Sequence, residues 1–261
     1  MANVTKKFAV IGYNISYSKS PKIHNAWFKQ YGIDAEYEIM DVNPDELSTI
    51  KHLGLTGANV TIPYKKSILQ HIDSTEGWGA VNTIKFSGSK AIATNTDALA
   101  IDQVLCGRDP SSKVLIIGNG GAALAAYWAL TNQNMTNIHV LRRNYQRQEF
   151  LGKQVQFIDW SSIYNKATMF DIVINATPGN SCIPDWVFEN MSENTFIVDF
   201  AYAEHEPPLT SYARKRGLQL VDGRELLISQ AQHAFKYWFD IFPSVDADFY
   251  KCIFPEMKGV S

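Results

Sequence analysis

The stretch VLIIGNGGAA, residues 114–123, decides the fold of this chain. An apolar run that reads as a buried strand enters a glycine-rich turn, and an alanine-rich helix follows. Gly118 makes the tight turn, Gly120 lets the backbone approach a pyrophosphate, and Ala123 permits close helix–strand packing. The N–H groups and the positive end of the helix then face phosphate. An ordinary tight turn is the alternative, but a second strand at 137–144 supports a dinucleotide site.

The end of that second strand distinguishes between two dinucleotide cofactors. NAD-binding units carry an Asp or Glu about 20 residues after the glycines, where it binds the ribose 2′-hydroxyl. Here the segment LRRNYQR has no carboxylate and three arginines, Arg142, Arg143 and Arg147. A 2′-phosphate needs cations at that place, and the forked guanidinium donors match it. The sequence therefore favours NADP, with a solvated basic helix start as the alternative reading.

Apolar runs alternate with capped amphipathic segments along the rest of the chain. Strands are expected at residues 7–12, 35–42, 57–62, 170–178, 195–202 and 217–223, with a hairpin over 80–97. Helices are expected after Ser20 as N-cap and after Asn43. This alternation predicts an α/β fold with parallel sheet covered on both faces. We expect one domain over residues 1–97 and a nucleotide-type domain over 98–225, with a C-terminal helix over 226–261 that returns to the first domain.

Composition excludes several classes of protein. The 261 residues are 46% hydrophobic and 19% charged, with a net charge of −2, which is ordinary for a globular protein and favours neither nucleic acid nor a membrane surface as partner. No apolar run approaches the length of a membrane span, and the N-terminus lacks the apolar stretch of a secretory signal. The 3 cysteines show no metal-binding spacing. We expect a cytoplasmic protein without a metal, as a monomer or homodimer.

The N-terminal part carries polar residues in unusual places. Hydroxyls at a helix entry form a natural seat for a carboxylate, and residues two apart on a strand share one face. Each residue alone is more often structural, since Asn and Asp populate turns for local reasons. The set comprises Ser18 and Ser20 at a helix entry, Asn59 and Thr61 on one strand, Lys65 after Pro63, Asn82, and Asp97 at the end of a strand. Together they suit a small, polyhydroxylated, anionic substrate.

At this point the motifs resemble a known family, the shikimate dehydrogenases. The matching stretches occur in the family's order between residues 12 and 233: SYSKSPKIHN, GANVTIPYK, GAVNT, NTDA, GNGGAA, NAT, DFAY and DGRELLISQA. The resemblance implies NADP-dependent interconversion of 3-dehydroshikimate and shikimate in aromatic amino-acid biosynthesis. It also implies an N-terminal α/β substrate domain and a Rossmann-type NADP-binding domain, with the substrate in the cleft between them.

The resemblance also implies roles for individual residues. Lys65 and Asp97 match the catalytic pair, and Lys66 matches no role. Lys65 would either supply a proton to the developing alkoxide or stabilise its charge, and both roles stay open. Substrate binding is implied for Ser18, Ser20, Thr61, Asn82, Tyr202 and Gln230, with Asn59 in support. Cofactor binding is implied for Gly118, Asn119, Gly120, Gly121, Ala122, Arg143, Asn144, Arg147, Phe200 and Gly223.

Departures from the family's usual pattern leave other functions to be weighed. Tyr17 stands where the family commonly has His, GYNI replaces Gly-x-Pro-Ile, and Arg142 stands where Asn is usual. None of these touches the catalytic pair. The alternatives are a quinate/shikimate dehydrogenase that uses NAD, a methylene-tetrahydrofolate dehydrogenase with the same domain plan, and a nucleotide-sensing protein without catalysis. The arginines, the paired serines and the Lys65–Asp97 pair, respectively, argue against these three.

Overall fold

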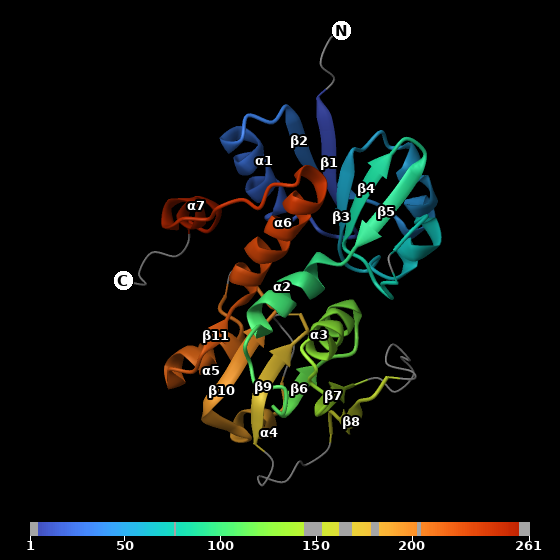
Figure 1. Cartoon of the computed structure of the whole chain (residues 1–261). Helices are drawn as coiled ribbons and strands as arrows, with labels where there is room; N and C mark the ends of the chain where they lie inside the picture. The colour runs from blue at the N-terminus through green and yellow to red at the C-terminus, as the bar shows by residue number, and fades with distance from the viewer. Residues whose placement is uncertain are drawn as a thin grey trace. The chain divides into compact units, whose positions relative to one another are not determined.

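The structure of the chain divides into two compact units (Figure 1). It is a computed structural model that describes residues 5–255 apart from 76, 144–152, 162–168, 179–182 and 203–204. The first unit combines Met1–Thr96 with Gln230–Ser261, and the second is Asp97–Ser229. Within the described ranges, no helix is long and apolar enough to cross a membrane.

The first unit contains a mixed sheet with the strand order β2-β1-β3-β4-β5. Its strands are β1 (Lys6–Gly12), β2 (Ala35–Asp41), β3 (Gly57–Val60), β4 (Thr83–Ser87) and β5 (Lys90–Thr94). β1 pairs in parallel with β2 and β3, whereas β4 is antiparallel to both β3 and β5. β4 and β5 form the predicted hairpin, in which Gly88 adopts a φ of +59° that suits glycine.

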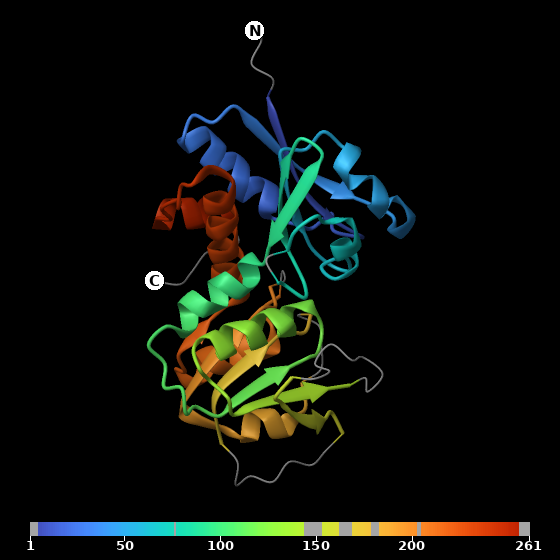
Figure 2. The ribbon, with the colours of Figure 1, turned by 45° about the vertical axis from the view of Figure 1, so that its right-hand side comes forward.

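Both faces of this sheet are covered: successive residues of β1 point to opposite sides, and Phe8, Ala9, Val10 and Ile11 are all buried. Ala9 and Ile11 join a core with η1 (Pro44–His52) and η2 (Ser67–His71). Phe8, on the other face, lies 5.3 Å from the Phe28 ring of α1 (Ser20–Gln30) and 4.8 Å from Trp238. The C-terminal half of α6 (Gly223–Phe239) is the second helix on that face. Figure 2 shows α1 and α6 together beside the sheet. The expected single helix over 226–261 is wrong: α6 ends at Phe239, and a separate short helix, α7 (Ala247–Ile253), follows.

Three local expectations for the first unit are corrected by the structure. α1 begins one residue earlier than expected, so Lys19 and not Ser20 is its N-cap. The helix after Asn43 is a 3₁₀ helix, with the capping box between Asn43 and Glu46. β3 ends at Val60, so Thr61 lies beyond the strand, because the Tyr64 N–H bonds back to the Thr61 carbonyl and turns the chain.

The second unit is built on a fully parallel sheet with the order β11-β10-β9-β6-β7-β8. The strands are β6 (Val114–Ile117), β7 (Ile138–Arg142), β8 (Gln156–Asp159), β9 (Phe170–Asn175), β10 (Met191–Asp199) and β11 (Leu220–Val221). Numbered from β6, this is the 3-2-1-4-5-6 order of a doubly wound dinucleotide fold, whose order reverses between β6 and β9. The predicted α/β class is therefore confirmed, although β8 was not anticipated.

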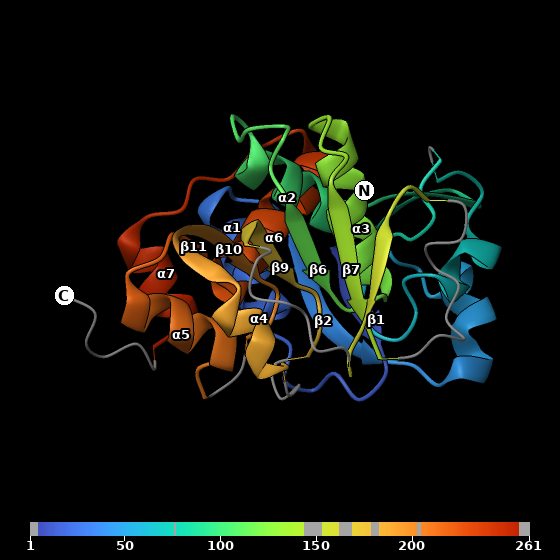
Figure 3. The same ribbon diagram turned by 90° about the horizontal axis from the view of Figure 1, so that it is seen from below.

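Helices cover both faces of this parallel sheet. Figure 3 shows α2 (Thr96–Leu105) and α3 (Gly121–Asn132) on one side, and α4 (Asp185–Glu189) and α5 (Pro208–Arg216) on the other. Asp97 lies in the first turn of α2, so its predicted place at the end of a strand is wrong. The cause is a distant side chain: Asn82 Oδ1 accepts the Thr96 N–H at 2.6 Å and starts the helix there.

Candidate active site

Polar side chains of the first unit form one hydrogen-bonded network, called here the amide–hydroxyl network: Asn59, Asn82, Thr83, Thr96 and Gln230. Asn59 Nδ2 donates to Thr83 Oγ1 at 2.9 Å and to the Asn82 carbonyl at 3.2 Å. Thr96 Oγ1 lies 3.0 Å from Thr83 Oγ1, 3.1 Å from Asn82 Oδ1 and 3.5 Å from Gln230 Oε1. The structure thus joins two predicted substrate-binding residues, Asn82 and Gln230, and places Asn59 beside them.

The two predicted serines lie at the entry of α1. Ser20 is buried, and its N–H donates to Ser18 Oγ at 3.3 Å. The turn before them is held by Asp41 at the end of β2, whose carboxylate accepts the N–H groups of Asn14 at 2.8 Å and Ile15 at 3.2 Å. Sequence reasoning missed Asp41, because these contacts span more than 25 residues.

The two lysines after Pro63 differ in their surroundings. Lys65 is half-buried and its carbonyl accepts the Val81 N–H at 2.9 Å, whereas Lys66 is exposed. Tyr64, between Pro63 and Lys65, is buried and donates its hydroxyl to the Val42 carbonyl at 2.5 Å. The turn that carries Lys65 is therefore attached to the body of its unit on both sides. Asp97, its predicted partner, is 9% exposed and opens the second unit.

The glycine-rich turn of the second unit has the geometry that the sequence predicts. Gly118 has a φ of +105°, and a Cβ there would lie 3.0 Å from Thr177 Cγ2 and 3.2 Å from the Ala176 carbonyl oxygen. Gly120 is the N-cap of α3 in an extended conformation, and Gly121 begins the helix. The first turn of α3 carries no acidic side chain. This turn and helix end therefore fit a pyrophosphate, and Asn119 and Ala122 in the same segment are half-buried.

The end of β7 presents its arginines in two different ways. Arg142 is half-buried, and its guanidinium lies 3.8 Å from the centre of the Phe157 ring. Arg143 is exposed, with its guanidinium 5.1 Å from the Trp160 ring. Arg143 is thus the described arginine that fits a 2′-phosphate. The predicted Asn144 and Arg147 lie outside the described residues.

A buried carboxylate fixes the loop after β10. Asp199 accepts hydrogen bonds at 2.9 Å from Asn175 Nδ2, the Ala201 N–H and Thr210 Oγ1. Burial raises the pKa of Asp199, and these donors partly offset that effect. The Phe200 N–H adds a bond to the Asn175 carbonyl at 2.9 Å. Phe200 and Tyr202, both predicted site residues, are half-buried on this loop.

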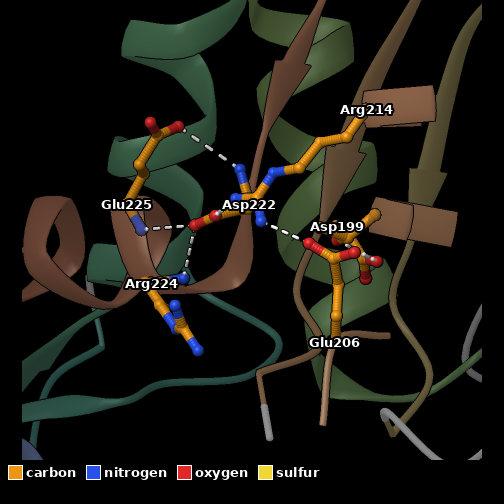
Figure 4. Close-up of polar contacts among 7 residues, drawn as sticks. Asp199, Glu206, Arg214, Asp222, Arg224 and Glu225 are labelled. Atoms are coloured by element: carbon orange, nitrogen blue, oxygen red, sulfur yellow. Dashed lines mark hydrogen bonds and ion pairs between the residues drawn. The ribbon is translucent and has the colours of Figure 1, made fainter. Parts of the chain in front are cut away.

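The start of α6 is fixed against the same loop. A Cβ on Gly223 would lie 2.3 Å from the Ala201 carbonyl oxygen, so only glycine fits. Asp222 Oδ1 accepts the N–H groups of Arg224 at 2.9 Å and Glu225 at 3.1 Å. Figure 4 shows this cap and Arg214, which bonds Asp222 Oδ2 at 2.6 Å and also pairs with Glu206. These contacts hold Gly223 at the loop that carries Phe200.

Comparison with known proteins assigns both units to one family. Residues 10–84 match the model of the shikimate dehydrogenase substrate binding domain, and residues 103–204 match that of shikimate / quinate 5-dehydrogenase. A protein of Bartonella quintana named shikimate dehydrogenase (NADP(+)) is 35% identical, over 93% of this chain and 90% of its own. The chain belongs to the shikimate dehydrogenase family. The resemblance inferred from the sequence motifs is therefore confirmed.

Other shikimate dehydrogenases are similar over the whole chain. The Methanocaldococcus jannaschii protein of the same name is 33% identical, over 93% of this chain and 94% of its own. A shikimate dehydrogenase crystallised in complex with NADP+ has a TM-score of 0.81 and 30% identity, covering 98% of this chain and 96% of its own. The Thermus thermophilus shikimate 5-dehydrogenase, in complex with NADP(H) and shikimate, has a TM-score of 0.79 and 25% identity, covering 97% and 100%.

Proposed function

We propose that this chain reduces 3-dehydroshikimate to shikimate with NADPH, reversibly, in the biosynthesis of aromatic amino acids. The observation that carries the proposal is a match to proteins named shikimate dehydrogenase (NADP(+)) over 93% of the chain. In this chain, the glycine turn around Gly118 suits the pyrophosphate of NADP, and the exposed Arg143 suits its 2′-phosphate. The proposed protein is a cytoplasmic monomer or homodimer of residues 1–97 with 226–261 for the substrate and 98–225 for the cofactor.

Cofactor binding is assigned to the second unit. Gly118, Asn119, Gly120, Gly121 and Ala122 hold the pyrophosphate at the start of α3, and the 2′-phosphate is held by Arg143, Asn144 and Arg147. Phe200 and Gly223 line the nicotinamide, which supplies the hydride when NADPH is bound. The start of α3 without an acidic side chain fits the pyrophosphate, and the lack of room for a side chain at Gly223 fits the nicotinamide.

Substrate binding and proton transfer are assigned to the remaining site residues. Ser18, Ser20 and Tyr202 hold the carboxylate, and Thr61, Asn82 and Gln230 hold ring hydroxyls. Lys65 supplies the proton to the oxygen of the ring ketone as negative charge develops there, and its own charge stabilises that oxygen. Asp97 orients Lys65 and accepts from a substrate hydroxyl. The proton transfer contributes about 10²–10⁴-fold to the rate.

Replacement of the two lysines tests this assignment. Lys65→Ala should lower kcat by about 10²-fold or more, because the proton donor is lost. Lys66→Ala removes the same group one residue further on, from an exposed side chain, and should change kcat by less than about twofold. The measurement is NADPH formation from shikimate and NADP⁺, with circular dichroism to show that both variants fold. Similar losses in the two variants would contradict the role of Lys65.

Quinate is the second candidate substrate, because the matching family model covers both shikimate and quinate dehydrogenases. Initial rates with shikimate and with quinate, each with NADP⁺ and NAD⁺, separate the two. We expect the highest kcat/KM for shikimate with NADP⁺. A higher kcat/KM for quinate, or for NAD⁺, would replace the proposed function with the second one.

A further inference from the structure

Tyr37 on β2 lies behind the amide–hydroxyl network and has no role in the mechanism described so far. Its side chain is buried, with 4% of the residue exposed, and its hydroxyl donates to Asn59 Oδ1 at 2.7 Å. We propose that Tyr37 is a positioning residue: its hydroxyl holds Asn59 so that the Asn59 amide donates to Thr83, and Thr83 in turn keeps Asn82 in place to present its N–H donor to a ring hydroxyl. This inference rests on the proposed function.

Two main-chain groups determine how the two amides are oriented. A main-chain N–H only donates, so the oxygen of Asn82, and not its nitrogen, faces the Thr96 N–H at 2.6 Å. A carbonyl only accepts, so the nitrogen of Asn59 faces the Asn82 carbonyl at 3.2 Å. The oxygen of Asn59 must then face Tyr37, which is the donor of that pair. These contacts therefore determine which end of each amide is the oxygen and which is the nitrogen.

The orientation of Asn82 decides what it offers to a ligand. Asn82 is 3% exposed, and its oxygen is occupied by Thr96 N and Oγ1 and by Thr83 Oγ1, 3.3 Å away. Among the described residues, its Nδ2 donates to none. The site therefore offers a fixed N–H donor, which requires a lone pair from the ligand, as a ring hydroxyl oxygen supplies. An orphaned donor at this position would penalise a ring that lacks that hydroxyl.

Tyr37 is itself held in place by contacts with α1, so it can hold Asn59 in turn. Asn25 of α1 bonds both main-chain groups of Tyr37 at 2.9 Å, and thereby also covers the outer edge of β2. The phenol ring stacks on the His24 ring, with centroids 4.5 Å apart and planes at 15°. Burial raises the pKa of Tyr37 well above its usual value, so the hydroxyl keeps its proton. The donor that orients Asn59 is therefore present at every working pH.

The test is Tyr37→Phe, which keeps the stacked ring and removes the hydroxyl alone. Loss of one network hydrogen bond should raise the KM for shikimate by about five- to tenfold, with the KM for NADP⁺ changed by less than about twofold. The matched control is Tyr212→Phe, which removes a half-buried hydroxyl that donates to the Phe188 carbonyl at 3.0 Å in the second unit. The control should leave both KM values unchanged.

A double variant separates positioning from a general loss of stability. Because Tyr37 acts through Asn59 and Thr83, Tyr37→Phe and Thr83→Val should be non-additive, and the double variant should raise the shikimate KM no more than the stronger single variant. An unchanged shikimate KM in Tyr37→Phe, equal increases in both KM values, or full additivity would each overturn the inference. A wild-type protein inactive with shikimate and NADP⁺ would instead overturn the proposed function.

Discussion

Gly223→Ala should destabilise the second unit by an amount that its surroundings allow us to estimate. The added Cβ would lie 2.3 Å from the Ala201 carbonyl oxygen, 2.6 Å from the Ala201 carbonyl carbon and 2.9 Å from the Phe200 carbonyl oxygen. Ordinary carbon–oxygen contacts are about 3.3–3.6 Å, so the loop must move by about 1 Å. All three atoms are main-chain, so the cost should reach the upper end of overpacking, about 3 kcal/mol. The better helix propensity of alanine returns at most about 1 kcal/mol.

A net loss of about 2 kcal/mol should lower the melting temperature by roughly 4–8 °C for a protein of this size. Because the displaced carbonyls belong to the loop with Phe200, the dissociation constant of NADPH should rise as well. Thermal unfolding followed by circular dichroism and NADPH titration by fluorescence are the two measurements. Gly79→Ala is the matched control, since no heavy atom lies within 4 Å of its Cβ position. A Gly223→Ala protein that melts within about 1 °C of wild type would refute the packing argument.

Two more variants test the charges of each unit. His24 is fully buried, and burial lowers its pKa to about 3 from an ordinary 6.5. Below pH 6.5 the His24 side chain is therefore protonated in the unfolded state but stays neutral in the folded state. The free energy of unfolding therefore falls as the pH falls from 6.5 towards 3. In His24→Phe this fall between pH 7 and pH 4 should be smaller by about 3 kcal/mol, as measured by urea unfolding at each pH. Arg143→Ala should raise the KM for NADP⁺ by about 10–100-fold and leave that for NAD⁺ unchanged, because a charge-assisted bond to the 2′-phosphate is lost. Arg216→Ala, which removes an exposed arginine 5.6 Å from the Tyr212 ring, should change neither KM, and equal effects of the two arginines would exclude the role of Arg143.

The second unit was largely predictable because its signals are local in sequence. Strand, turn and helix around Gly118 follow each other within a few residues, and each choice of residue agrees with the fold. The four-residue strand β8 escaped prediction because so short a segment, Gln156–Asp159, shows no usable periodicity. The helix α7 escaped prediction for the same reason, since it has only 7 residues.

The details of the candidate site were less predictable because they depend on contacts between distant residues. The start of α2 is set by Asn82, 14 residues before Thr96, so the place of Asp97 in a helix has no local signal. Tyr37 and Asn59 are 22 residues apart, and nothing in either segment indicates that a buried phenol meets that amide. Motifs predicted which residues form the candidate site, whereas the directions of their hydrogen bonds could be seen only in the folded structure.

The division of the first unit into two chain segments has a consequence for expressing parts of the protein. The chain leaves this unit after Thr96, within α2, and re-enters it at Gln230, within α6. Trp238, on the returning segment, donates to the Ile84 carbonyl at 2.9 Å and packs on Phe8. A fragment that stops at residue 96 would keep α1 on this face but would expose the apolar surface that α6 covers, including part of Phe8, and should therefore aggregate. Co-expression with the C-terminal segment, or a short linker in place of residues 97–229, should give a soluble protein.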